Sequence, residues 1–198
     1  MKEKLLNLEQ KIFNCKRCDF LYKIRKLKIQ NCPALGFGLD NYLNAKVCSI
    51  CEVPGSFKPK TGEVLIEKLE DFHKHYDDRI KYKSLIGKRL FTIYSAANLT
   101  WNDVQHFNTV CCANMNNQVP TFTEVDNCKE FLLERINLLQ NVKVIIAFGS
   151  ITKDVVEKFD LKVPVIYSHH PSYLFAYMKK DERQKHLDEL VLKIKAYV

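Results

Sequence analysis

Val142-Lys-Val-Ile-Ile-Ala-Phe148, followed at once by Gly149-Ser150, is the stretch that decides the fold. A short apolar run rich in Val and Ile and ended by Gly is typical of a strand buried on both faces. The residues after Gly149 predict a helix that continues to about Phe159. A buried strand that leads through one tight turn into a helix indicates a β-loop-α unit and a parallel sheet.

The rest of the chain repeats this order. Further buried strands are expected over residues 45–51, within residues 104–112 and over residues 163–167. The segment Thr121-Phe-Thr-Glu124 is a capping box that opens one of the helices. The other helices are expected at residues 2–13, 62–76, 87–97 and 181–196. The pattern predicts an α/β fold of three layers, α/β/α, around a mainly parallel sheet of four strands.

Length and composition limit the class of protein. The chain has 198 residues, of which 46% are hydrophobic and 27% charged, as expected for one globular domain. The sequence contains no run of about 18 apolar residues and no apolar core of a signal peptide near its start. We therefore expect a cytoplasmic protein, monomeric and not associated with a membrane. The net charge of +8 is compatible with a polyanionic partner such as DNA.

Polar residues follow three of the expected strands. Glu52 comes after the strand at 45–51, Asn108 follows residues 104–107, and His170 follows the strand at 163–167. Ligands bind at the carboxyl ends of parallel strands, so these side chains are candidates for one pocket. Each also has a structural interpretation: a surface carboxylate, a turn residue and a loop histidine packed on a tyrosine.

The cysteines are the second informative pattern. Cys15 and Cys18 form a C-x2-C pair, and Cys112 and Cys128 lie far downstream. Four thiolates from two distant segments suit a metal ion or an iron–sulfur cluster that ties an N-terminal arm onto the body of the protein. Disulfides are disfavoured in a chain of cytosolic character.

Cys48 and Cys51 form a second C-x2-C and provide an alternative. Together with Cys15 and Cys18 they would make a four-cysteine zinc site. Against this, the two residues lie in an expected buried strand, whose alternating side chains cannot both turn to one metal. The same alternation is expected to place Cys111 and Cys112 on opposite faces.

Taken in order, these segments resemble the family 4 uracil-DNA glycosylases. The resemblance covers most of the chain, and its most specific parts are the cysteine quartet and the H-P-S-Y-L motif. The matching segments are Cys15/Cys18, Gly36-Phe-Gly38, Glu52-Val-Pro54-Gly55, Asn108-Thr-Val-Cys-Cys112, Pro120, Cys128, Val144-Ile-Ile-Ala-Phe-Gly149 and His170-Pro-Ser-Tyr-Leu174.

The resemblance implies a DNA glycosylase that flips out uracil or a related base and hydrolyses its N-glycosidic bond. It also implies a uracil-DNA glycosylase-like fold and a four-iron, four-sulfur cluster on Cys15, Cys18, Cys112 and Cys128, with zinc as the alternative occupant. The partner is then DNA.

Site roles follow from the same resemblance. Glu52 would orient water or stabilise the sugar cation, Asn108 would pair with the base edge, and His170 would donate to a base oxygen. The remaining expected contacts are stacking on the base by Tyr82 or Phe57, wedging into DNA by Tyr173 and Leu174, and phosphate binding by Lys179 and Lys180.

The departures from the family pattern lie around the pocket. Cys51 replaces the first Gly of the G-E-x-P-G motif, and residues 56–86 form an insertion. The cluster-binding arm is expected at about residues 1–32 of the single domain. We expect the insertion to contain a helix at about residues 62–75 that shapes substrate choice. Two alternatives remain: a non-catalytic or altered-specificity DNA-binding member of the same superfamily, and an electron-transfer protein.

Overall fold

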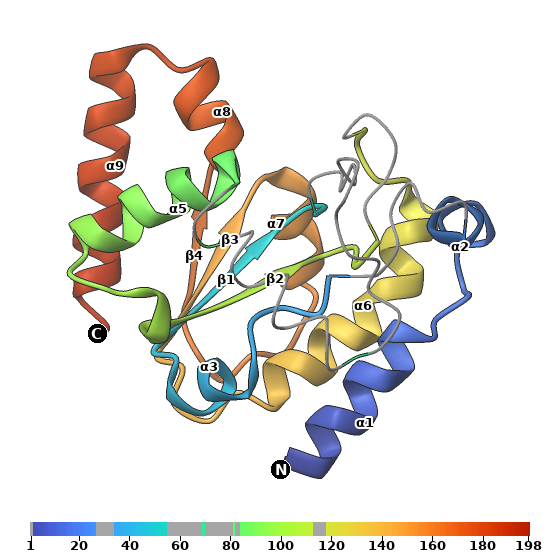
Figure 1. The fold of residues 1–198 in the computed structure, drawn as a ribbon. Coiled ribbons are helices and arrows are strands. Elements are labelled where there is room, and N and C mark those ends of the chain that lie inside the picture. Colours follow the sequence, from blue (N-terminus) through green and yellow to red (C-terminus); the bar gives the residue numbers. More distant parts are fainter. Residues whose placement is uncertain (1, 27–33, 55–68, 70–80, 82–83, 113–117) are drawn as a thin grey trace.

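A four-stranded, all-parallel sheet forms the centre of the protein (Figure 1). The structure is a computed structural model and describes residues 2–26, 34–54, 69, 81, 84–112 and 118–198. The strand order is β2-β1-β3-β4, with three neighbouring pairs in parallel register. The strands are β1 (Val47–Cys51), β2 (Val104–Asn108), β3 (Val144–Phe148) and β4 (Val165–Ser168).

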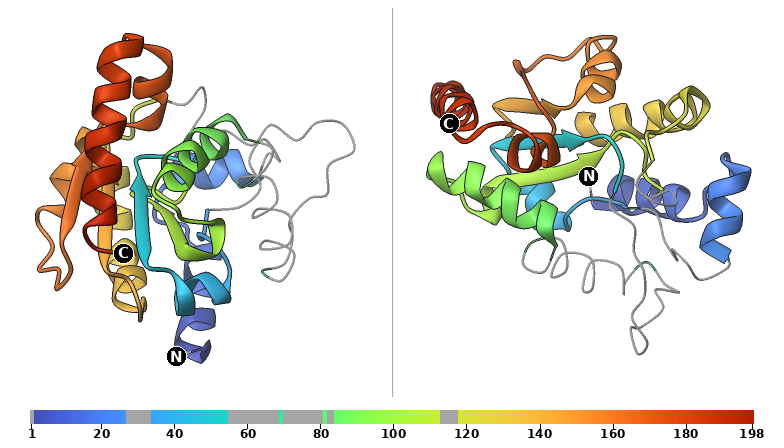
Figure 2. Two further views of the ribbon diagram at one scale, coloured as in Figure 1. Left: turned by 90° about the vertical axis from the view of Figure 1, so that its left-hand side faces the viewer. Right: turned by 90° about the horizontal axis from the view of Figure 1, so that it is seen from above.

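Helices cover both faces of this sheet, as Figures 1 and 2 show. Helices α5 and α9 lie on one face and helices α6 and α7 on the other, with α1 packed against α6. This is the predicted three-layer α/β/α architecture. The helices are α1 (Lys2–Phe13), α2 (Asp19–Lys26), α3 (Leu39–Asn44), α5 (Leu85–Ala96), the 3-10 turn η2 (Trp101–Asp103), α6 (Phe122–Asn137), α7 (Ser150–Val156), α8 (Pro171–Ala176) and α9 (Lys180–Lys195).

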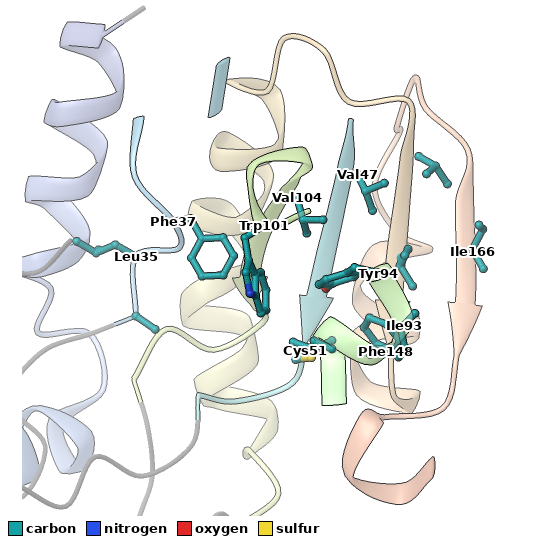
Figure 3. Packing of buried hydrophobic residues seen from close by; sticks show 14 of the residues in the cluster. Leu35, Phe37, Val47, Cys51, Ile93, Tyr94, Trp101, Val104, Phe148 and Ile166 are labelled. Atoms are coloured by element: carbon teal, nitrogen blue, oxygen red, sulfur yellow. The ribbon is translucent and has the colours of Figure 1, made fainter. Parts of the chain in front are cut away.

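Alternation along β1 divides the core in two. Val47 and Cys51 pack into the cluster under α5 and α9, part of which is shown in Figure 3. Cys48 and Ile50 pack into the cluster under α6 and α7. Every residue of β1 is buried, as expected for a central strand covered by helices on both faces.

Most expected elements are present within a few residues of their predicted ends. The strand expected within residues 104–112 ends at Asn108. The short helices α3 and α8 were not predicted, since six residues carry too little periodicity to distinguish them from a loop. The helix expected at about residues 62–75 lies outside the described residues. Within the described part of the chain, no helix has both the length and the apolar character needed to cross a bilayer.

Arg135 on α6 is fully buried and connects three segments of the chain. Its guanidinium donates to the carbonyl oxygens of Ala34 and Leu35, each at 3.4 Å, and to that of Asn108 at 3.2 Å. It also donates to Cys111 Sγ at 3.3 Å and stacks over the Phe107 ring at 4.7 Å. Among the described residues, no carboxylate forms an ion pair with it.

Replacing Arg135 by Met should therefore destabilise the fold. The change leaves several buried carbonyl oxygens without a donor, and each such group costs about 1–3 kcal/mol. We expect the free energy of unfolding to fall by at least about 2 kcal/mol in urea titrations. Lys129→Met is the matched control, because Lys129 lies on the exposed face of the same helix. Equal stability of the two variants would contradict this account of Arg135.

Candidate functional site

A cavity of about 610 Å³ lies at the carboxyl edge of the sheet. Glu52, directly after β1, Asn108, the last residue of β2, and His170, two residues after β4, all line it. The structure therefore brings together the three residues that sequence spacing placed at strand ends. Their chemical roles remain predictions.

Glu52 is half-buried and held by backbone groups. Its carboxylate accepts a hydrogen bond from the Ile151 N–H at 3.4 Å, and its own carbonyl accepts from the Val110 N–H at 3.0 Å. Burial raises the pKa of the Glu52 carboxyl above its usual value, and the Ile151 N–H opposes this shift. A carboxylate with few fixed partners is suited to interact with a water molecule or a developing cation.

Gly149 provides the space that Glu52 occupies. It has a φ of +93° between β3 and α7, and a Cβ atom added there would overlap the Glu52 carboxylate. Glycine is needed at this position for two reasons, backbone conformation and the close approach of a side chain. The turn that ends the fold-deciding strand thus packs directly against Glu52, which lines the site.

Asn108 is placed by its backbone. Its carbonyl oxygen accepts from Arg135, and Thr109 N–H bonds to the Cys51 carbonyl at 2.8 Å, which joins the ends of β1 and β2. The Asn108 side chain is only 3% exposed and makes no hydrogen bond to another described residue. A buried amide without internal partners is available to bind a ligand, since leaving it unpaired is costly.

His170 is the N-cap of α8. Its Nδ1 accepts a hydrogen bond from the Ser172 N–H at 3.2 Å, so in the neutral ring the proton is on Nε2. Burial, with a smaller effect from the positive charge of Arg89, lowers the pKa of His170. The histidine is therefore a neutral ring with one N–H donor.

Three further lining residues were missed by the sequence reasoning. Arg89 on α5, His106 on β2 and Tyr177 after α8 also line the cavity. For His106 a signal was present, because it lies two residues before Asn108 and strand alternation puts both on one face. Arg89 and Tyr177 have no such signal, since their approach depends on how α5 and α8 pack together.

Of the residues expected to contact DNA, three are exposed and one is buried. Tyr173 is 48% exposed and stacks near Tyr177, with ring centroids 6.2 Å apart. Lys179 and Lys180 are exposed at the start of α9. Leu174, however, is fully buried. The wedge expected at Leu174 is therefore corrected, because helix α8 turns that side chain into the core.

A second cavity is lined by thiols. Cys15, Cys18, Cys112 and Cys128, the predicted ligand set, share it with Cys111. The expectation that Cys111 and Cys112 face opposite sides is wrong, because β2 ends at Asn108 and alternation no longer applies. By contrast, Cys48 and Cys51 do pack on opposite faces of β1, which disfavours a zinc site that uses both.

The donor chemistry of this cysteine cluster fits a thiolate-bound metal centre. The sulfur atoms receive N–H donors: Arg17 N to Cys15 at 3.5 Å, Asn127 Nδ2 to Cys18 at 3.4 Å and Arg135 to Cys111 at 3.3 Å. Hydrogen bonds to sulfur are a common feature around iron–sulfur clusters. Among the described residues, no three His, Cys, Asp or Glu side chains are already arranged to hold a metal ion.

A parallel sheet covered by helices on both faces, with a polar cavity at its carboxyl edge, defines an α/β protein with a ligand site at the strand ends. A family model of the uracil DNA glycosylase superfamily matches residues 37–195. The chain belongs to this superfamily. It is also similar to the Type-4 uracil-DNA glycosylase of Archaeoglobus fulgidus, with 24% identity over 165 residues, covering 83% of this chain and 69% of that protein.

Phe57 and Tyr82, the two candidates for stacking on a base, lie outside the described residues, as does nearly all of the insertion at 56–86. Ser84, Leu85 and Ile86 at its end line the cavity. Residues 84–86, where the insertion rejoins the fold, therefore form part of the cavity wall.

Substituting Gly149 by Ala should impair the site more than the fold. The backbone at Gly149, with φ +93° and ψ 162°, lies in a region nearly restricted to glycine and costs about 1–3 kcal/mol for a residue with a side chain. The new methyl group also displaces the Glu52 carboxylate. We expect a stability loss of that size together with a decrease of at least about 10-fold in the rate of any reaction that uses Glu52. Denaturant titration and steady-state rates measure the two effects.

Gly36→Ala is the matched control for this prediction. Gly36 has a φ of +95°, and its added Cβ would meet the Phe107 ring and the His106 carbonyl oxygen rather than Glu52. It should lose stability with little loss of rate per folded molecule. A Gly149→Ala variant that keeps full activity would show that the position of Glu52 is not restricted by this glycine.

Proposed function

We propose that this protein is a DNA glycosylase that flips uracil or a related base out of DNA and hydrolyses its N-glycosidic bond. The observation that carries the proposal is the convergence of Glu52, Asn108 and His170 on one cavity from three strand ends. Membership of the uracil DNA glycosylase superfamily supports the same class of reaction.

Hydrolysis of this bond forms a cationic sugar and an anionic base, so the site must stabilise both charges. Asn108 offers a donor and an acceptor to the base edge. His170, neutral and protonated at Nε2, donates to the base oxygen on which charge grows. Glu52, when ionised, orients the attacking water or stabilises the sugar cation.

DNA would bind across the carboxyl edge of the sheet. Tyr173 and Tyr177 are exposed aromatic rings beside the cavity, suited to contact the bases around a flipped nucleotide. Lys179 and Lys180 would bind phosphates, in keeping with the net charge of +8. Phe57 or Tyr82 would stack on the base.

The cysteine cluster would hold a four-iron, four-sulfur centre through Cys15, Cys18, Cys112 and Cys128. Such a centre, when bound, supplies a structural link, because hydrolysis of a glycosidic bond moves no electrons. It would fix the N-terminal arm, about residues 1–32, to the segment that follows Asn108 and to α6. The whole chain then acts as a single glycosylase domain.

Glu52→Gln, Asn108→Ala and His170→Ala should each reduce excision of uracil by about 100-fold or more, because each removes a transition-state contact. Single-turnover cleavage of single- and double-stranded oligonucleotides with uracil, hypoxanthine or modified pyrimidines is the measurement. Glu157→Gln is a surface control. A wild-type protein that binds DNA but excises no base would instead indicate a non-catalytic DNA-binding member of the superfamily.

The pH dependence of excision should follow from the same groups. Activity needs ionised Glu52, whose pKa is raised above 4.5, and neutral His170, whose pKa is lowered below 6.5. The rate should therefore fall on the acid side, where Glu52 and His170 take up protons, and stay level at higher pH. A rate that rises on acidification through this range would require the opposite protonation states.

The cofactor prediction is tested by purification without oxygen. The protein should be brown and contain roughly four iron and four sulfide atoms per chain. Cys112→Ser should lose the colour, whereas Cys48→Ser should keep it, since Cys48 is buried on the other face of β1. Colourless protein with one zinc per chain, or colour lost only in Cys48→Ser, would exclude the assigned cluster and ligands.

A further inference from the structure

His106 lies at the inner end of the cavity and has no role in the mechanism above. It is two residues before Asn108 on β2, on the same face of the strand, and lines the same cavity. Positions two residues apart in a strand are separated by ~6.6 Å, and His106 is farther from the carboxyl edge. A base held by Asn108 therefore has His106 beneath its inner edge.

The orientation of the His106 ring is set by a neighbouring strand. Ser49 on β1 is its register partner, and Ser49 Oγ lies 2.9 Å from His106 Nδ1. The ring also packs against Phe37, with centroids 5.9 Å apart. With Nδ1 bound to Ser49, the nitrogen left for a ligand is Nε2.

The hydroxyl of Ser49 indicates which nitrogen of His106 carries the proton. Ser49 is fully buried, and among the described residues its hydroxyl has one side-chain partner of standard hydrogen-bond geometry, His106 Nδ1. A buried O–H left without an acceptor is costly, so the Ser49 hydroxyl donates to Nδ1. The neutral ring then carries its hydrogen on Nε2.

The charge of His106 is equally well defined. Burial lowers its pKa to about 3, and the neighbouring His170 and Arg135 contribute in the same direction. The ring is only 3% exposed. A neutral ring with its hydrogen on Nε2 can donate a hydrogen bond from that atom but cannot accept one there. It can therefore distinguish an oxygen from an amino group on a ligand.

The chemistry of a pyrimidine nucleotide identifies the group that His106 would meet. The sugar is attached at N1, and the substituent at C4, across the ring, enters deepest when the base is flipped into a pocket. That substituent is an oxygen acceptor in uracil and an amino donor in cytosine. We propose that His106 is a specificity-determining residue that donates a hydrogen bond from Nε2 to the oxygen at C4, an inference that rests on the proposed function.

The test compares two substrates and two variants. Rates of excision are measured on oligonucleotides that carry uracil or 2-pyrimidinone, which lacks the oxygen at C4. His106→Phe should lower kcat/KM for uracil about 5- to 10-fold, the effect of one neutral hydrogen bond, and leave 2-pyrimidinone unchanged. An equal decrease for both substrates, or none for uracil, would overturn the proposal.

His186→Phe is the matched control. His186 on α9 pairs with Ser168, Oγ to Nε2 at 2.9 Å, in the same way that His106 pairs with Ser49, but it does not line the cavity. It should leave the ratio of the two substrates unaltered. The same change of ratio in His186→Phe would assign the effect to loss of a Ser–His pair in general and overturn the proposal.

A measurement on the unmutated protein covers the case in which His106→Phe does not fold, and it does not need excision activity. Nitrogen NMR of ¹⁵N-histidine-labelled protein should show His106 as the neutral Nε2–H tautomer, with a shifted Nε2 signal on saturation with free uracil. An Nδ1–H tautomer, or an Nε2 signal unaffected by bound uracil, would overturn the proposal. A protein that excises no base but shows this shift would contradict the proposed function alone.

Discussion

A positive charge inside the protein, on Arg135, organises the structure around it. A guanidinium is costly to bury unless its donors are satisfied. Here the acceptors come from the N-terminal segment, the end of β2, the cysteine cluster and its own helix. These segments are far apart in the chain, and each must be correctly placed before the charge is satisfied. Cys111 and Tyr42, with smaller effects from Cys128 and Cys48, raise the pKa of Arg135 against the effect of burial.

The cavity depends on the same arrangement. Arg135 binds the carbonyl of Asn108, and the Glu52 and Cys51 carbonyls accept from the residues that follow Asn108. The backbone at the ends of β1 and β2 is therefore positioned from behind by the core, which leaves the side chains of Glu52 and Asn108 available on the cavity side. Rigid main chain with available side chains is the arrangement that preorganised sites need.

The architecture could be predicted from the sequence because strands, helices and their connecting turns leave short-range patterns in it. The run from Val144 to Phe148 and its Gly exit are local, and so are the residues at the strand ends. Prediction from the sequence failed where the packing of helices decides which side chains reach the cavity, as for Arg89. It also failed where a regular element stops, since Cys111 and Cys112 line the same cavity once β2 has ended. The burial of Leu174 likewise follows from a six-residue helix that leaves almost no periodic signal.

His170 combines two tasks in one imidazole ring. One nitrogen caps the backbone at the start of α8, and the other is free to meet a ligand. The exposed Tyr173 and Tyr177 are carried by this same helix and the residue after it. In the proposed function, a base that binds His170 Nε2 would contact the same ring that caps α8 through Nδ1. Binding of the base and placement of the two tyrosines would then be coupled through one imidazole.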